Sequence, residues 1–540
     1  MASKINQHSF TNQPTIKKKR SLFDRSFTHR TTFNSDYLIP FYLDDVIPGD
    51  TFSLRSDALA RISTLLKPIM DNIYISTFYF FVPNRLVWEN WQKFCGEQDN
   101  PSDTTDYRIP KLTISPGGVA NGSIHDYMGL PPSIDIGDDV VDCLFPRAYN
   151  LIWNQWFRDE NLQDSVTVKT DDTSDLDTDY TLLKRCKKHD YFTSCLPWPQ
   201  KGPQIDLPLG TSAPVKGLYS STNLFVGTSQ NLYDTNQNIV TVPNSYNINT
   251  SSDTPTLFYD APATDADPTK SYPNIYTDLS DATAATISQL REAMQIQSFF
   301  ELDARGGTRY TEILRAHFGV VSPDQRLQYP EYLGGSSTTG SITPVAQTSG
   351  QYISGGGGAE TTPQANLSAI GTVSFSDRGF NKSFVEHGMI IGLISARADL
   401  TYSQGINKMR TRSTKFDYYW PSFNCIGEQA VLNRELYCDG SDADDDVFGY
   451  QERYAEYRYK PSQISGLFRS SAPQSLDIWH LSQDFSNLPT LNSQFIEENV
   501  PMERVKALVS EPDFIIDIHT TMRTIRPMPL YSIPQSFMRF

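Results

Sequence analysis

The chain has 540 residues, of which 38% are hydrophobic and 20% charged, and its formal net charge is −16. That acidic balance excludes a general nucleic-acid binder and confines any such contact to local basic segments. The 34 prolines, 28 tyrosines and 30 phenylalanines favour strands joined by long connections over a helical bundle.

The first 36 residues are predicted to form an extended basic arm. Residues 1–30 contain seven Lys or Arg and one acid, Asp24. Such cations neutralise phosphates, and interleaved phenylalanines can stack on the bases of single-stranded nucleic acid. A nuclear signal, a solvated tail and an anchor on a neighbouring subunit remain alternatives. The predicted nucleic-acid contacts are Lys17, Lys18, Lys19, Arg20, Arg25 and Arg30.

Residues 37–61 predict two strands around the turn at Pro48, and a third strand follows over residues 73–82. This third strand is apolar or aromatic on both faces, so both faces need cover, from insertions of the chain or from neighbouring subunits. After Pro83 we expect one short amphipathic helix that carries Trp88 and Trp91. The pattern favours an assembly over a solitary enzyme.

Further along the chain, helical spacing predicts helices at about 146–158, 282–302 and 308–318. Residues 201–281 hold eight Asp and no Glu and read as one long surface insertion. The Gly/Ser/Thr-rich residues 333–372 predict a flexible or extended loop. Residues 387–402, 450–460 and 514–524 predict strands. Strands at both ends of the chain suit a jelly roll whose first and last strands pair.

Chemical motifs are scarce, and no catalytic, cofactor-binding or metal site is predicted. The sequence has no GxGxxG, Walker, HExxH or GxSxG motif. The acidic run Asp439–Asp446 fails the EF-hand pattern, which leaves a solvated loop or a weak cation site at a subunit contact. No nucleophile or metal-ligand residue stands at a spacing from His317, His387 or His519 that would indicate a catalytic or metal site, so we interpret these histidines as structural. The pairs Trp88/Trp91 and Trp153/Trp156 are interpreted as core in preference to sugar platforms.

The six cysteines are scattered without a CxxC pair, and the first residues are polar. Both observations favour synthesis in a reducing cytoplasm with free thiols and no export signal. No apolar run approaches the roughly 18 residues of a membrane span, so no membrane insertion is expected.

Several long blocks resemble the major capsid protein of gokushoviruses, a branch of the Microviridae. The resemblance covers nearly the whole chain except about 205–280 and parts of 335–370 and 439–446. The blocks are Phe23–Phe52, Pro68–Gln98, Ala304–Gly335, Phe384–Gly405 and Val447–Ser470.

This resemblance implies a mainly β fold, an eight-stranded antiparallel jelly roll of viral capsid type with long loop and helical insertions. The implied function is self-assembly into a T=1 icosahedral shell around a circular single-stranded DNA genome, made in the bacterial cytoplasm and located in the virion. Residues 37–200 and 282–540 would form one capsid domain, and 201–281 a threefold protrusion that meets a host surface receptor. A small internal DNA-binding or pilot protein is a further expected partner.

Two other classes of protein remain to be distinguished. A secreted or surface carbohydrate-binding β-adhesin would share the aromatic, acidic and strand-rich composition, but would usually need an export signal. A jelly-roll enzyme of cupin type would need clustered His and carboxylate ligands, which the sequence does not offer.

Overall fold

The computed structural model describes residues 19–104, 106–137, 140–203, 287–306, 310–318, 328–348, 351–353, 360–362 and 364–531, with five residue pairs between 215 and 277. The chain divides into two compact units. The first unit comprises Met1–Pro199, Thr308–Arg315 and Gly319–Phe540, and the second comprises Gln200–Gly307 and Ala316–Phe318.

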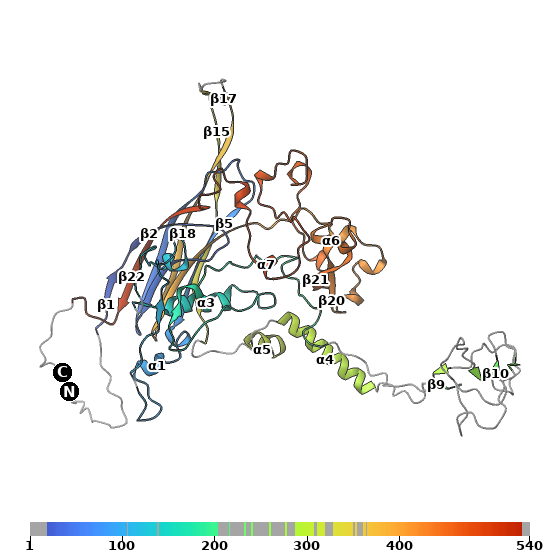
Figure 1. The fold of residues 1–540 in the computed structure, drawn as a ribbon, viewed down its shortest axis with the longest axis horizontal. Coiled ribbons are helices and arrows are strands. Elements are labelled where there is room, and N and C mark those ends of the chain that lie inside the picture. Colours follow the sequence, from blue (N-terminus) through green and yellow to red (C-terminus); the bar gives the residue numbers. More distant parts are fainter. Residues whose placement is uncertain are drawn as a thin grey trace, which may run out of the picture. The chain divides into compact units, whose positions relative to one another are not determined.

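Two antiparallel sheets form the body of the first unit (Figure 1). The larger has the order β1-β22-β4-β18-β15, and β2 also pairs with β22. The smaller has the order β14-β5-β19-β3. The strands of the larger sheet are β1 (Ser21–Asp24), β2 (Phe27–Phe33), β4 (Thr51–Ile62), β15 (Ser341–Ala346), β18 (Leu367–Ser383) and β22 (Phe514–Arg526). Those of the smaller sheet are β3 (Ile39–Val46), β5 (Ile73–Pro83), β14 (Glu331–Thr339) and β19 (Gly388–Ala398).

Alternation along the strands builds the core between the two sheets. In β22, Phe514, Ile516 and Ile518 are buried, while the residues between them are exposed. They pack in one cluster with Phe52 of β4 and Tyr79 of β5. Burial of each such side chain stabilises the fold by roughly 1.5–3 kcal/mol. The last strand, β22, pairs with β1, where Ser21 lies opposite Arg526, although β1 falls in the predicted extended arm; the first predicted strand, β3, pairs with β19 instead.

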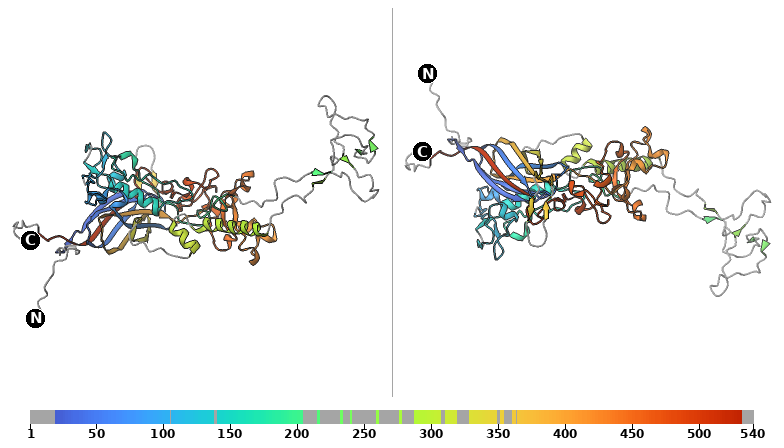
Figure 2. Two further views of the ribbon diagram at one scale, coloured as in Figure 1. Left: turned by 90° about the horizontal axis from the view of Figure 1, so that it is seen from below. Right: turned by 90° about the horizontal axis from the view of Figure 1, so that it is seen from above.

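A second apolar layer covers the outer face of the smaller sheet. Helix α3 (Leu144–Trp156) packs Tyr149, Ile152 and Trp153 against residues of β5 and β19, including Phe80 and Leu393. In the left view of Figure 2, the teal helical segment of this part of the chain lies beside the blue strands. Strand β5 is therefore buried on both faces as predicted, and the cover on its outer face comes from the chain itself. This strand offers no open apolar face to a neighbouring subunit.

Short elements complete the first unit. The strands are β6 (Lys111–Thr113), β7 (Val141–Asp142), β8 (Asp175–Leu176), β16 (Gln351–Ile353), β17 (Glu360–Thr362), β20 (Glu428–Leu432) and β21 (Val447–Glu452). The α-helices are α1 (Trp91–Phe94), α2 (Ile124–Tyr127), α6 (Asn433–Leu436) and α7 (Ser493–Ile496). The 3-10 helices are η1 (Asn84–Leu86), η2 (Asp177–Asp179), η3 (Lys408–Arg410), η4 (Lys415–Asp417), η5 (Pro421–Phe423), η6 (Asp442–Asp445), η7 (Ala455–Tyr457), η8 (Gly466–Phe468), η9 (Asp477–Trp479) and η10 (Met502–Arg504).

The second unit holds α4 (Ile287–Gly306) and the last residues of α5 (Tyr310–Phe318). Within it, His317 Nε2 lies 2.6 Å from Asp303 Oδ1. The predicted insertion at 201–281 falls almost entirely outside the described residues. Its described parts after residue 203 are β9 (Val215–Lys216), β10 (Leu232–Tyr233), β11 (Ile239–Val240), β12 (Tyr259–Asp260) and β13 (Tyr276–Thr277).

Three sequence predictions were wrong in detail. The loop predicted over 333–372 contains β14, β15 and the start of β18. Small residues let β14 lie close to β5, since a Cβ on Gly335 would stand 2.1 Å from Thr77 O. The strand predicted over 450–460 ends at Glu452, since Tyr454 adopts a φ of 61°. The helix predicted after Pro83 is split into η1 and α1.

The mainly β, jelly-roll character is confirmed. The count of eight strands is not, because the two sheets contain six and four strands among the described residues.

Candidate assembly and nucleic-acid surfaces

The six cations predicted to contact nucleic acid do not form one continuous arm. Lys17 and Lys18 lie outside the described residues, and Lys19 is exposed. Arg20 donates to Gly49 O at 2.6 Å and to Thr51 Oγ1 at 2.8 Å, which ties the beginning of β1 to the turn before β4. From Ser21 to Phe33 the expected arm is β1 and β2, both paired with β22.

Arg25 lies partly buried at the edge of the sandwich. Its guanidinium forms a bidentate pair with Asp44, at 2.7 and 2.9 Å. Tyr42 also donates to Asp44, and the Asp44 side chain is 7% exposed. Arg25 therefore anchors the connection between β1 and β2, and its charge is directed to a buried carboxylate of its own chain.

Arg30 belongs to a larger surface, the outward face of the six-stranded sheet, which we call the open sheet face. On each strand the residues between the core positions are exposed, so β2, β4, β18 and β22 contribute to one surface. The exposed arginines of this face are Arg30, Arg55, Arg61, Arg378 and Arg523.

The open sheet face has a mixed but predominantly basic chemistry. Asp517 pairs with Arg30 at 3.3 Å, and Asp57 pairs with Arg55 at 3.1 Å. Arg523 lies opposite Asp24 of β1, so three of the five arginines are partly neutralised. Leu59 and Ile515 are 44% and 53% exposed. Arginines among hydroxyl and aliphatic side chains can bind phosphates and can also meet another protein chain. The sequence analysis singled out Arg30 but not the other four arginines, although their position between apolar strand residues was the available signal.

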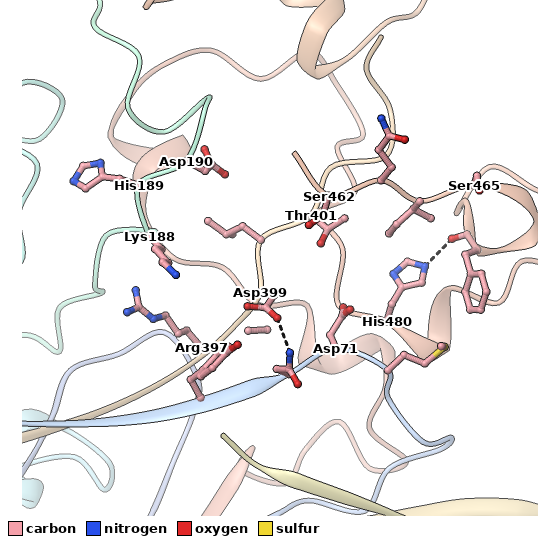
Figure 3. Close-up of a pocket in the computed structure, with 18 of the residues that line it drawn as sticks. Asp71, Lys188, His189, Asp190, Arg397, Asp399, Thr401, Ser462, Ser465 and His480 are labelled. Atoms are coloured by element: carbon pink, nitrogen blue, oxygen red, sulfur yellow. Dashed lines mark hydrogen bonds between the residues drawn. The ribbon is translucent and has the colours of Figure 1, made fainter. Parts of the chain in front are cut away.

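A cavity with a volume of about 860 Å³ lies between β5, β19 and the loops at 188–190 and 462–480 (Figure 3). Lys188, His189 and Arg397 lie on one side, and burial lowers the pKa of Arg397. Asp399 accepts a hydrogen bond from Asn72, and His480 bonds to Phe468 O. The polar groups thus mainly hold the surrounding loops together, and the cations Lys188 and Arg397 line the cavity together with the acids Asp190 and Asp399.

The remaining candidate residues have structural partners. The His387 ring packs on Trp91 with centroids 5.6 Å apart, and His519 Nδ1 lies 3.2 Å from Thr28 Oγ1. Trp88 and Trp153 are buried, which confirms the core interpretation for them, whereas Trp156 is 44% exposed. Within the described ranges, no group of three or more His, Cys, Asp or Glu is placed to hold a metal ion. None of the helices described is both long and apolar enough to cross a membrane.

Comparisons with known proteins identify the class. Residues 11–536 match the family model described as capsid protein (F protein). The chain is 46% identical to capsid protein VP1 of Bdellovibrio phage phiMH2K over 100% of both chains. It is 42% identical to capsid protein VP1 of Chlamydia phage 1 over 98% of both chains, and 37% identical to that of Spiroplasma virus 4 over 94% of both.

A β-sandwich with full-length similarity of this kind defines a structural protein of the phage capsid. The chain belongs to the F-protein family of capsid proteins, among the major capsid proteins of the gokushovirus branch of the Microviridae. Its place is the virion, as part of a shell of many subunits.

Proposed function

We propose that copies of this chain assemble into a T=1 icosahedral shell that encloses a circular single-stranded DNA genome. The carrying observation is the full-length similarity to phage capsid proteins. The chain supplies binding surfaces in place of a reaction centre. Weak contacts suffice in a closed shell, because each copy is held by several neighbours at once.

For the genome, the proposal assigns two basic surfaces on an otherwise acidic chain. One is the N-terminal cluster Lys17–Arg20, and the other is the open sheet face. Arg20, the last residue of the cluster, donates hydrogen bonds to Gly49 O and Thr51 Oγ1 at the turn before β4, which places this end of the cluster beside the larger sheet. Arginine side chains on a flat sheet can neutralise phosphates without reading the base sequence.

DNA content of purified particles tests this assignment. Replacing Arg55, Arg61 and Arg523 with Ser (the sheet variant) and, separately, neutralising Lys17–Arg20 (the cluster variant) should each lower the DNA content per particle while shells still form. The control replaces exposed Arg108 and Arg291 with Ser, which should leave the DNA content unchanged. Normal DNA content in the sheet variant would remove the open sheet face from the genome contacts.

For the host, the proposal assigns residues 201–281 as a surface protrusion at the threefold axes that contacts a host receptor. Its acidic composition, with eight Asp and no Glu, sets it apart from the rest of the chain. Trimming residues about 210–275 should spare shell formation and reduce attachment to host cells. Loss of all assembly would instead make the segment part of the scaffold. A small internal DNA-binding or pilot protein remains a predicted partner.

A further inference from the structure

The hairpin of β20 and β21 is flanked at its two ends by surface segments of different composition. Glu428 pairs with Glu452 at one end, and Leu432 pairs with Val447 at the other. Val431 and Phe448 pack with Phe192 in a core cluster of the first unit, so the hairpin is a fixed element. Its two ends are about 13–17 Å apart, from the rise per residue of a strand.

The end after β20 carries an acidic loop, defined as residues 439–446. Asp439, Asp442, Asp445 and Asp446 are exposed, and Arg434 pairs with Asp445. The buried Asp444 accepts hydrogen bonds from Gly440 N at 2.9 Å and Cys438 Sγ at 3.2 Å. The loop is closed by Asn433, which donates to Ala443 O at 2.9 Å. These hydrogen bonds fix the conformation of the loop, so its exposed carboxylates are held in defined positions.

The other end carries an aromatic-basic patch, formed by the segments 410–420 and 457–460. Six rings are 46–54% exposed: Phe416, Tyr418, Tyr419, Trp420, Tyr457 and Tyr459. The Arg412 guanidinium lies 4.4 Å from the centroid of Tyr457 and 5.0 Å from that of Tyr418. Tyr419 N donates to Tyr457 Oη at 3.3 Å, which joins the two segments.

Cations surround these rings. Arg410, Lys415 and Lys460 are exposed. Arg458 is also exposed but pairs with Glu452, and Arg412 pairs with Glu456. The remaining acid of the two segments, Asp417, accepts a hydrogen bond from Thr414 N. Half-exposed Tyr, Trp and Arg are the residues enriched at the energetic centres of protein interfaces. A patch of this composition therefore calls for a covering partner, and its charge specifies an acidic one.

We propose that in the shell the acidic loop of one copy docks on the aromatic-basic patch of the next copy. The occupant is a second copy because the same hairpin carries the complementary charge at its other end. Such a contact joins two different surfaces, so repetition around a rotation axis closes a ring. This inference rests on the proposed shell, and it also gives a role to the acidic run that the chemical motifs left unexplained.

Charge reversal in the full-length chain tests the pairing. The loop variant is Asp442→Lys with Asp446→Lys, and the patch variant is Arg410→Glu with Lys415→Glu. Each should lower the yield of shells by about tenfold or more, because like charges then face each other at every copy of the contact. The four-fold combination restores opposite charges and should return the yield to within about threefold of wild type. The control reverses exposed charges elsewhere, with Arg108→Glu and Asp164→Lys.

The outcomes separate the alternatives. Urea unfolding of the unassembled variants should match wild type, which shows that each variant folds. Wild-type yield in either two-site variant, or failure of the combined variant to recover, overturns the pairing. Normal shells that lack DNA in the patch variant would assign the patch to nucleic acid and overturn the proposal. Absence of shells from the wild-type chain itself would instead refute the proposed function.

Discussion

The layer that covers the outer face of the smaller sheet depends on one buried ion pair, between Arg147 of α3 and Asp175 of β8. Both side chains are 0% exposed. Arg147 donates to both oxygens of Asp175, with its Nε at 2.7 Å and its Nη2 at 3.1 Å. Tyr180 donates to the same carboxylate at 2.6 Å. Although burial alone would raise it, these hydrogen bonds hold the pKa of Asp175 below its ordinary value.

Asp175→Asn should destabilise the chain by about 3–5 kcal/mol, because it leaves the Arg147 charge buried without its counter-ion. Arg147→Met should cost at least as much. It removes the same pair and also the donor to three backbone carbonyls, those of Val87, Asp171 and Thr173. Combining Arg147→Met with Asp175→Leu removes both charges, so the double variant should cost much less than the sum of the two single changes.

Urea unfolding of the unassembled chain measures these free energies. Exposed Asp164→Asn is the matched control and should change stability by less than about 0.5 kcal/mol. Proteolysis in the loop at 167–174 should also accelerate in Asp175→Asn, since that loop is tied to Arg147. A loss below about 1 kcal/mol for Asp175→Asn, or strict additivity in the double variant, would refute this account.

Three further predictions concern stability. Burial raises the pKa of Glu498 to about 7, above its unfolded value. The free energy of unfolding should therefore fall by on the order of 3 kcal/mol as pH rises from about 5 to 8. Glu498→Gln should flatten this pH profile in urea titrations, and an unchanged slope in the variant would contradict the prediction. Gly335→Val should cost about 3 kcal/mol by forcing β14 away from Thr77 O, whereas exposed Thr339→Val should be nearly neutral in the same unfolding assay. Arg25→Met should cost about 1–2 kcal/mol and speed amide exchange in β1, while Arg30→Met, whose pair is exposed, should do neither.

Local pattern was sufficient for much of the fold. The two-sided apolar run at 73–82 predicted β5, and helical spacing of aromatic residues predicted α3. The pattern at residues 335–339 was misleading, because glycine and hydroxyl residues resemble a loop when the strand they lie against is unknown. Likewise, the sequence showed that β5 needs cover on both faces but not whether α3 or another subunit supplies it.

The candidate surfaces were harder to predict from the sequence than the fold. A run of cations such as Lys17–Arg20 is visible in the linear chain, but Arg55 and Arg523 join one surface only through the pairing of β4 with β22. Arg25 shows the opposite error, since a basic residue of the expected arm is bound to Asp44 at the sandwich edge. Register and partner identity, which depend on contacts hundreds of residues apart, decide which charges face outward.

The place of β22 between β2 and β4 also has a consequence for biosynthesis. The first strands to leave the ribosome, β1 and β2, have no edge to join until the last strand emerges. The growing polypeptide consequently keeps a gap in its larger sheet until translation is nearly finished. Until then the edge of β4 that β22 later occupies has unpaired backbone groups, so unfinished chains carry a strand edge that another chain could join.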